Sequence, residues 1–298
     1  MFMSNKLIVH ALIPARGGSK SIIRKNIRQY KEHPLLVHSI LSAIEVPFIK
    51  RVVVSTDCPE IKKIAIKNGA EAPFLRPNDI SGDYSTDLEC FQHYISWLRL
   101  MGQEIPDVII HLRPTYPKRD NAILQKCLSK FILIRDKYSC LRTVVPIDKS
   151  LFKMYTVNEE DMILKPTYKK FDNIEEPYNQ VRQILPTTYL HNGCIDIINR
   201  TTIEKGSMTG DKIYAYIMPK EETYDIDTEE DWKRSLYGTL DNYVDDIDDI
   251  NNIDDINNIE EITNEISNDL SFIKSKPIDI PLRDNFKKNG NGNYFYTY

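Results

Sequence analysis

Short apolar runs alternate with amphipathic stretches along the first 150 residues of the chain. The apolar runs have the length of buried strands, and they are residues 7–14, 51–55, 72–75, 108–112 and 139–145. The amphipathic stretches place apolar side chains three or four positions apart, as helices do, and they are residues 35–45, 59–68, 86–100 and 121–134. This alternation predicts an α/β fold, with a mostly parallel twisted sheet and helices on both of its faces.

Local signals support these boundaries and indicate where a ligand would bind. Thr86 or Ser85 is expected to cap the helix that follows, because Glu89 stands near the position that completes a capping box. In open parallel sheets, ligands bind beyond the carboxyl ends of the strands. Three segments lie directly after a predicted strand, namely residues 15–26, 55–57 and 113–117.

The alternation stops at residue 147. Residues 147–190 are rich in Lys, Tyr, Asn, Glu and Pro and have little periodicity, so we expect an inserted arm for oligomerisation. Strands are predicted again at residues 194–198 and 213–218, and a helix capped by Thr228 runs to about residue 237. These elements complete one domain, residues 1–240.

The last part of the chain has a different composition. From residue 244 to residue 262 an apolar residue recurs at every third position between pairs of Asp, Asn or Glu, a spacing that builds no buried face on a helix or strand. Residues 241–298 carry a net charge of −8, against +4 for the remaining chain. We expect this acidic tail to be largely disordered, with a docking segment for an unknown partner as the alternative.

Bulk composition excludes several classes of protein. The N-terminus lacks the apolar segment of a signal peptide, and no apolar run is long enough to cross a membrane. The five cysteines are scattered, which argues against a zinc site and a disulfide framework and favours a reducing, cytoplasmic location. The weakly basic body suits small anionic substrates and is too weakly charged to indicate nucleic acid.

The segment from Pro14 to Asn26 reads P-A-R-G-G-S-K-S-I-I-R-K-N. It leaves a predicted strand through a Gly17-Gly18 turn, where backbone N–H groups can converge on phosphate oxygens. Arg16 can hold phosphate with a forked pair of hydrogen bonds, and Lys25 adds a further positive charge. The segment matches neither the Walker A pattern nor the dinucleotide-binding pattern.

A second group of polar residues, Asp225-Ile226-Asp227, places two carboxylates on the same side of an extended backbone. Two carboxylates together with a nucleoside triphosphate supply the hard oxygen ligands that Mg²⁺ prefers. A solvated strand end, or a negatively charged helix N-terminus, is the simpler interpretation of the same residues.

Seven segments, taken in order, resemble the acylneuraminate cytidylyltransferases, the CMP-sialic acid synthetases. They are I-P-A-R-G-G-S-K-x-I-x-R-K-N-I, V-V-S-T-D, F-L-R-P, L-R-P-T-Y-P, V-R-Q-I-L-P, H-N-G-C-I-D-I and Y-D-I-D-T, within residues 7–237. The resemblance implies a Rossmann-like nucleotidyltransferase fold and transfer of CMP from CTP to an acidic, sialic-acid-like sugar. It also implies Mg²⁺, with Mn²⁺ as the alternative, and a homodimer in which residues 147–190 reach the partner.

The resemblance also implies a role for individual residues. The residues expected to bind the nucleotide are Arg16, Gly17, Gly18, Ser19, Asn26, Arg76 and Ser85. Asp225 and Asp227 are the expected metal ligands, and the expected catalytic residues are Lys25, Arg182 and Asp227. The residues expected to contact the sugar are Arg113, Thr115 and Gln183.

Departures from the family pattern concentrate near the expected sugar. Arg113 and Tyr116 replace a Gln and a Ser, Leu190-His191 replaces Arg-Pro, and Asp87 stands where a hydroxyl residue is common. A legionaminic-type or otherwise modified nonulosonic acid is therefore a rival to N-acetylneuraminate.

Other functions stay open from the sequence. The first alternative is the same chemistry with other substrates, either an octulosonate or another nucleotide with an amino sugar. A metal-dependent glycosyltransferase would use Asp225 and Asp227 as its D-x-D site, but the Arg16 loop would then have no role. A non-catalytic scaffold with the acidic tail as its interaction element is the third.

Overall fold

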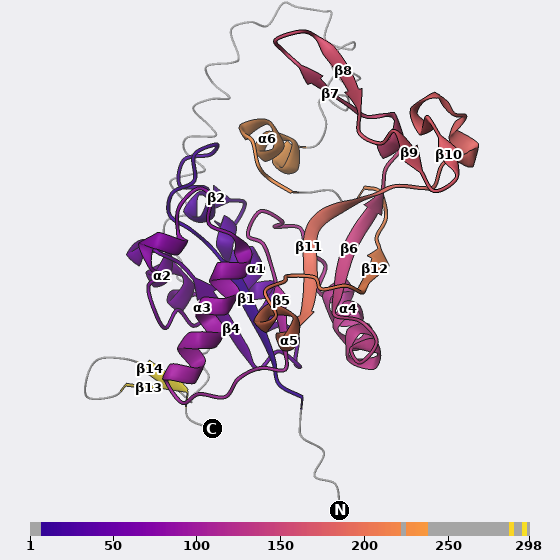
Figure 1. Ribbon diagram of the computed structural model, residues 1–298. Helices are drawn as coiled ribbons and strands as arrows, with labels where there is room; N and C mark the ends of the chain where they lie inside the picture. The colour runs from indigo at the N-terminus through magenta and orange to yellow at the C-terminus, as the bar shows by residue number, and fades with distance from the viewer. Residues whose placement is uncertain (1–6, 222–224, 238–285, 289–293, 297–298) are drawn as a thin grey trace, which may run out of the picture. The chain divides into compact units, whose positions relative to one another are not determined.

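A computed structural model of the chain describes residues 7–221, 225–237, 286–288 and 294–296. A six-stranded sheet forms its centre (Figure 1). In spatial order the strands are β12 (Ile213–Ile217), β6 (Cys140–Pro146), β11 (Tyr189–Asn199), β5 (Val108–His111), β1 (Val9–Pro14) and β4 (Arg51–Ser55). β11 runs antiparallel to both of its neighbours, and the other pairings are parallel. The expected fold class is confirmed.

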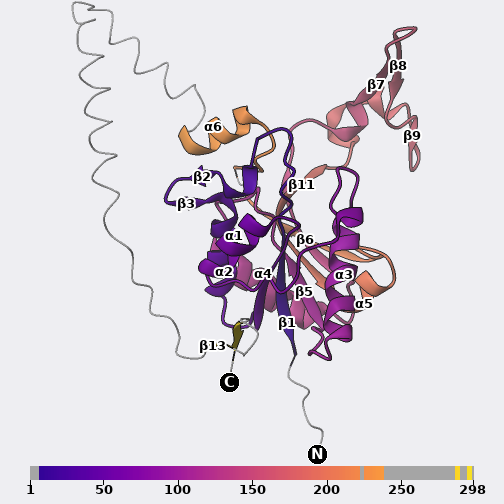
Figure 2. The same ribbon diagram turned by 90° about the vertical axis from the view of Figure 1, so that its left-hand side faces the viewer.

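Helices cover both faces of the sheet (Figure 2). One face packs against α1 (Leu35–Ile44), α2 (Pro59–Lys67) and α4 (Asn121–Ile134), and the other against α3 (Asp87–Leu100) and α5 (Arg200–Glu204). The two cores follow the alternation of side chains along a strand. In β1, for example, Ala11 and Ile13 contribute to the first core and Leu12 to the second, all fully buried.

The predicted boundaries agree with the structure to within a few residues at most elements. The helix expected to begin at Thr86 does so with a capping box, in which the Glu89 N–H donates to Thr86 Oγ1 and the Thr86 N–H donates to the Glu89 carboxylate. The strand predicted at 72–75 is wrong. Glu71 makes a single bridge to Val53, and pairing cannot continue because Pro73 has no N–H to donate.

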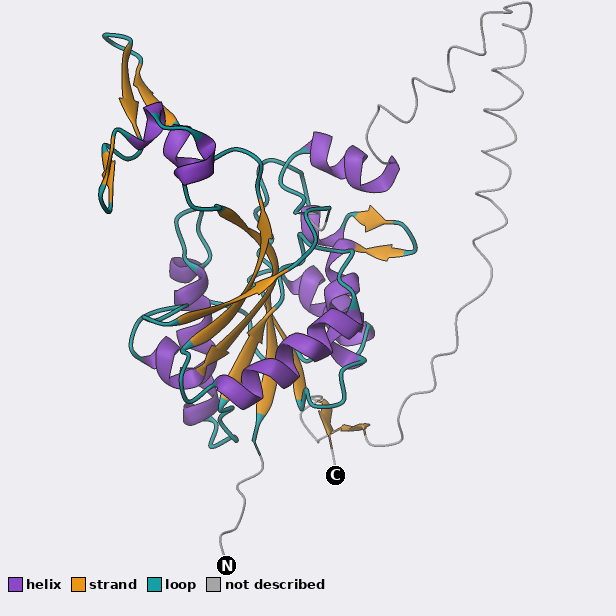
Figure 3. Cartoon of the chain, turned by 90° about the vertical axis from the view of Figure 1, so that its right-hand side faces the viewer, coloured by secondary structure: helices purple, strands orange, loops and turns teal. Residues whose placement is uncertain are grey.

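Residues 147–190 leave the sheet at the end of β6 and return to it at β11 (Figure 3). They form two hairpins, β7 (Tyr155–Asn158) with β8 (Ile163–Pro166), and β9 (Lys170–Phe171) with β10 (Ile174–Glu175), together with short 3₁₀ turns. A third hairpin, β2 (Gln29–Tyr30) with β3 (His33–Pro34), precedes α1. The helix α6 (Glu229–Tyr237) begins at Thr228, whose hydroxyl accepts from the Asp231 N–H as expected of a cap.

Contacts divide the chain into residues 1–239 and residues 240–298. In the second unit the structure describes only the paired strands β13 (Phe286–Lys288) and β14 (Tyr294–Tyr296), so the expected disorder of the acidic tail falls mostly outside the described residues. No helix among the described residues has both the length and the apolar character needed to cross a lipid bilayer.

Candidate active site

A cavity of about 530 Å³ opens at the carboxyl ends of β1 and β5. Its wall combines the loop after β1, the loop of residues 81–87, the end of β5 with the following turn, and the segment that carries Asp225 and Asp227, together with Arg76. This is the position that the parallel sheet predicts for a ligand. The cavity is lined mostly by polar and charged side chains, which suits a charged ligand.

The loop after β1 is held in place by partly buried hydrogen bonds. The Asn26 side chain donates to the Arg16 carbonyl oxygen at 2.9 Å, and the Gly17 N–H donates to Asp57 Oδ1 at 2.8 Å. A Cβ atom on Gly17 would lie 3.0 Å from the Cβ of Cys58, the residue before α2, so a larger residue at this position would force Cys58 to shift. These contacts fix the backbone from which Arg16 and Lys20 extend.

Arg16 and Lys20 both pair with Asp83 from the opposite loop. Arg16 Nη1 lies 3.2 Å from Asp83 Oδ1 and also donates to the Gly82 carbonyl oxygen at 2.9 Å. The hydrogen bond from Lys20 lowers the pKa of Asp83, which keeps this carboxylate ionised. The Asp83 carboxylate thus pairs with Arg16 and Lys20, the cations that are expected to contact phosphate.

Asp225 and Asp227 flank Ile226, which is fully buried and whose N–H donates to the Thr115 carbonyl oxygen at 2.9 Å. Lys25 reaches this segment from the loop after β1, with Nζ 3.0 Å from the Ile226 carbonyl oxygen and 3.1 Å from Asp227 Oδ1. Burial raises the pKa of Asp225, and the charge of Asp227 adds to the increase. Asp225 Oδ1 is buried without a hydrogen-bond partner among the described residues.

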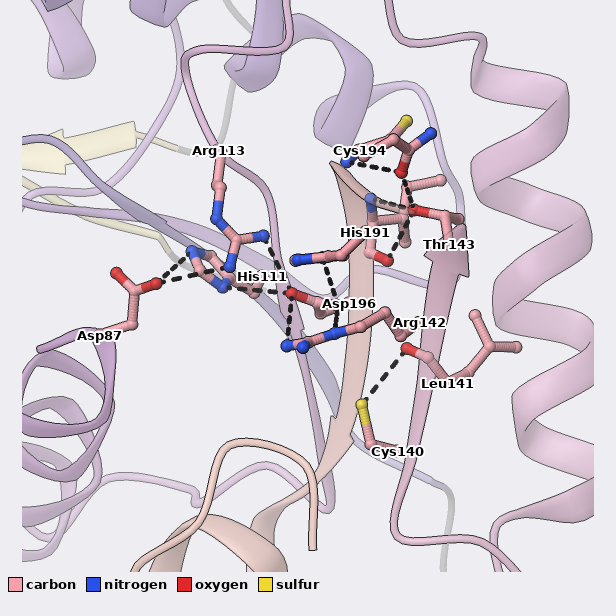
Figure 4. A network of polar contacts seen from close by, with 12 residues as sticks. Asp87, His111, Arg113, Cys140, Leu141, Arg142, Thr143, His191, Cys194 and Asp196 are labelled. Atoms are coloured by element: carbon pink, nitrogen blue, oxygen red, sulfur yellow. Dashed lines mark hydrogen bonds and ion pairs between the residues drawn. The ribbon is translucent and has the colours of Figure 1, made fainter. Parts of the chain in front are cut away.

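On the other side of the cavity, Arg113 belongs to a network around Asp196 (Figure 4). Arg113 Nη1 donates to Asp196 Oδ2 at 2.9 Å, and Arg113 Nη2 lies 3.5 Å from Asp87 Oδ2. His111, two residues earlier on the same side of the chain, lies between the two carboxylates. Burial lowers the pKa of His111 to about 4, so its ring is neutral at pH 7.

Known proteins match about three quarters of the chain. A family model described as cytidylyltransferase matches residues 10–96. A pseudaminic acid cytidylyltransferase of Campylobacter jejuni is 31% identical over 221 residues, which cover 74% of this chain and 91% of that protein. A CMP-N,N'-diacetyllegionaminic acid synthase of Legionella pneumophila is 28% identical, with 74% of this chain and 92% of that protein covered. The chain belongs to the acylneuraminate cytidylyltransferase family.

The family membership makes the chain a nucleotidyltransferase. An N-acylneuraminate cytidylyltransferase of Escherichia coli is 28% identical over 78% of this chain, which matches 52% of that longer protein. The fold agrees with the solved structure of a CMP:2-keto-3-deoxy-manno-octonic acid synthetase complexed with CTP, with a TM-score of 0.52 at 17% identity. That likeness covers 75% of this chain and 94% of the solved one.

The cytidylyltransferase fold brings most of the predicted site residues to one cavity. The predicted residues in its wall are Arg16, Ser19, Lys25, Asn26, Arg76, Ser85, Arg113, Thr115, Asp225 and Asp227. Gly17 and Gly18 lie beside the cavity and are not part of its wall. Arg182 and Gln183 lie in the 3₁₀ turn η5 (Arg182–Ile184) of the arm, outside the wall. The roles of all these residues stay predictions.

Several residues of this cytidylyltransferase site were not predicted. Asp83 could have been suspected from its place between Gly82 and Ser85, although a lone Asp in a loop is a weak signal. His111 shares a side of the backbone with Arg113, an i, i+2 relation that the sequence does show. Asp196 stands in the H-N-G-C-I-D-I segment, for which no residue role was expected, and Arg142 lies in an apolar run that predicted a strand only. No local pattern pairs these two residues, which are 54 positions apart.

Proposed function

We propose that the chain transfers CMP from CTP to the anomeric hydroxyl of a nonulosonic acid and releases pyrophosphate. The observation that carries this proposal is the convergence of Arg16, Lys25 and the two aspartates on one cavity. The printed names of the relatives, which specify pseudaminic, legionaminic and N-acylneuraminic acids, favour a nine-carbon sugar acid as the acceptor.

The residues present suit a divalent cation. Asp225 has a buried oxygen without a hydrogen-bond partner among the described residues, and Asp227 is adjacent and exposed to the cavity. No group of three or more His, Cys, Asp or Glu side chains in the described part of the chain could hold a metal ion. Asp225 and Asp227 would hold Mg²⁺ from the side of the protein, and phosphate oxygens of the substrate would supply further ligands. When bound, Mg²⁺ would neutralise phosphate charge and acidify the attacking hydroxyl.

The chain's own residues would contribute positioning and charge. Arg16 and Lys20, released from Asp83, would bind the phosphate oxygens of CTP. Lys25, fixed by the Ile226 carbonyl oxygen and Asp227, would stabilise the negative charge that develops when pyrophosphate leaves. The acceptor hydroxyl would attack the α-phosphorus opposite the leaving group, and rigid placement of both substrates would provide much of the rate.

Pyrophosphate release from CTP, UTP, GTP and ATP, each with a nonulosonic acid and Mg²⁺, tests the nucleotide part of the proposal. We expect turnover with CTP and little with the others. Asp227→Ala should abolish the release while the protein stays folded. Asp211→Ala, which removes an exposed carboxylate before β12, is the matched control and should retain full activity. Normal turnover by Asp227→Ala would contradict the assigned metal site.

We also propose that the enzyme is a homodimer in which the arm of residues 147–190 carries Arg182 and Gln183 to the partner's cavity. The β7–β8 hairpin supports this, because its side chains Val157, Met162, Ile163 and Leu164 are at least 50% exposed, as an uncovered interface would be. Mixing inactive Arg182→Ala and Asp227→Ala subunits tests it. Mixed dimers should regain activity, since one of their two sites is intact. No recovery in a mixture that light scattering shows to exchange subunits would contradict an arm that acts on the partner.

A further inference from the structure

Asp196 is a fully buried carboxylate surrounded by two arginines and a histidine. Arg142 donates to it through Nε at 2.7 Å and Nη2 at 3.3 Å, Arg113 donates through Nη1 at 2.9 Å, and His191 Nε2 lies 3.2 Å away. A carboxylate buried without partners would be strongly unfavourable, so these contacts are required for Asp196 to stay ionised. Burial alone would raise the pKa of Asp196, but His191 and Arg113 bring it below its usual range.

The sheet itself builds this arrangement. Asp196 on β11 lies directly opposite His111 on β5 and Arg142 on β6, so the registers of two strand pairs fix its position. The register of β11 against β6 shifts between His191 and Asp196, and the His191 side chain contacts the carboxylate. Three strands of a rigid sheet therefore hold Asp196, in contrast to the loops that form the rest of the site (Figure 4).

Arg113 connects this buried centre to the cavity. Its side chain lines the cavity together with Asp87, His111 and Thr115, whereas Asp196 is not part of the wall. Of the five N–H groups of the Arg113 guanidinium, the described residues engage one with Asp196 at 2.9 Å and one with Asp87 at the longer distance of 3.5 Å. The hydrogen bond between Arg113 and Asp196 is the shorter of the two, and Asp196 is fully buried. A ligand that binds Arg113 would therefore displace Asp87 from the guanidinium and leave Asp196 bound to it.

We propose that Asp196 is a positioning residue for Arg113, and that Arg113, so held, recognises the carboxylate of the sugar acid. This inference rests on the proposed function. A guanidinium presents parallel N–H groups that match the two oxygens of a carboxylate, and the match requires that the guanidinium plane be fixed. Asp196 fixes that plane from behind, and the ligand carboxylate takes the place of Asp87 in front.

The first test separates the two substrates. Arg113→Gln should raise the KM for the sugar acid at least tenfold and change the KM for CTP less than twofold. Arg113→Lys should restore little, because an ammonium group cannot form the forked contact. A change in the KM for CTP alone would assign Arg113 to the nucleotide and overturn the inference, and so would an unchanged KM for the sugar acid.

The second test asks whether Asp196 acts through Arg113. Asp196→Asn should raise the KM for the sugar acid, and the double variant with Arg113→Gln should be no worse than the worse single variant. Asp107→Asn is the matched control, because Asp107 accepts from the Ile8 N–H at 2.9 Å at the opposite end of the sheet. It should leave both KM values unchanged. Multiplied losses in the double variant would show that Asp196 acts independently of Arg113.

If Asp196→Asn does not fold, Asp196→Glu is the alternative variant, because it retains the negative charge. It moves the carboxylate by one methylene and should raise the KM for the sugar acid while the KM for CTP stays normal.

A neutral substrate gives the sharpest readout. The wild type should strongly prefer the free acid to its C1 methyl ester, and Arg113→Gln should lose that preference. Retention of the preference in Arg113→Gln would overturn the inference. A wild type inactive with every nonulosonic acid would instead overturn the proposed function.

Discussion

Ile226 separates the two aspartates of the site, and its side chain anchors both. It is fully buried in a small cluster with Ile22, Tyr30, Leu35 and Trp232. Ile22 belongs to the loop after β1 and Trp232 to α6, so this cluster joins the loop that carries Arg16 to the segment that carries Asp225 and Asp227. Ile226→Ala removes the side chain beyond Cβ and should loosen both parts of the site together.

The size of the effect follows from the burial. Loss of three buried carbon groups costs roughly 0.8 kcal/mol each, and the cavity left behind raises the total to about 3 kcal/mol. For a domain of this size, that destabilisation lowers the melting temperature by about 6 to 12 °C. A displacement of the catalytic groups on the order of 1 Å would reduce kcat/KM by about a hundredfold.

Thermal unfolding and CTP-dependent pyrophosphate release, the latter measured well below the transition, separate stability from activity. Ile203→Ala is the matched control, because Ile203 is equally buried but packs in the core between α3 and α5, away from the cavity. Both variants should lose similar stability, and only Ile226→Ala should lose activity while folded. Full activity in folded Ile226→Ala, or equal losses of activity in both variants, would contradict the role of Ile226 as an anchor of the site.

Three further substitutions test other contacts. Burial lowers the pKa of His10 to about 3. Below pH 6.5 the unfolded chain therefore binds a proton at this histidine, whereas the native state does not. Stability should therefore fall by roughly 2 kcal/mol between pH 7 and pH 5 through this group, and His10→Gln should reduce that loss in urea titrations; an unchanged slope would contradict the assignment. Asp83→Asn should lower the KM for CTP on the order of threefold, because Asp83 competes with phosphate for Arg16 and Lys20; a higher KM would show that Asp83 assists binding. Thr86→Ala should cost about 1 kcal/mol, seen as a melting temperature lower by about 2 to 4 °C, through loss of the capping box; an unchanged melting temperature would show that the cap contributes nothing.

The sequence predicted elements well where the deciding physics is local. The apolar run 51–55 became β4 with the same limits, because such a run can satisfy burial only inside a sheet. The failure at residues 72–75 is also local, since Pro73 ends pairing after Glu71. The antiparallel direction of β11 was not predictable, because it depends on which distant strands flank it.

The site divides in the same way. Arg16, Asn26 and the two aspartates follow strands or stand in recognisable patterns, so the rule for carboxyl ends of strands placed them together. Asp196 stands in the H-N-G-C-I-D-I segment, but its contacts were not predictable, because its partners Arg113 and Arg142 meet it only through the pairing of three strands. Buried ion pairs of this kind depend on how strands align in the sheet, and that alignment cannot be predicted from the sequence of one segment.

Mass spectrometry of the product most directly tests the claim that this enzyme joins CMP to a nonulosonic acid. The enzyme would be incubated with CTP, Mg²⁺ and a panel of N-acetylneuraminic, legionaminic, pseudaminic and octulosonic acids. We expect pyrophosphate and a CMP-sugar from at least one nine-carbon acid, at a rate above that of the octulosonic acid. Free nucleotide without a CMP-sugar, or turnover of the octulosonic acid alone, would contradict it.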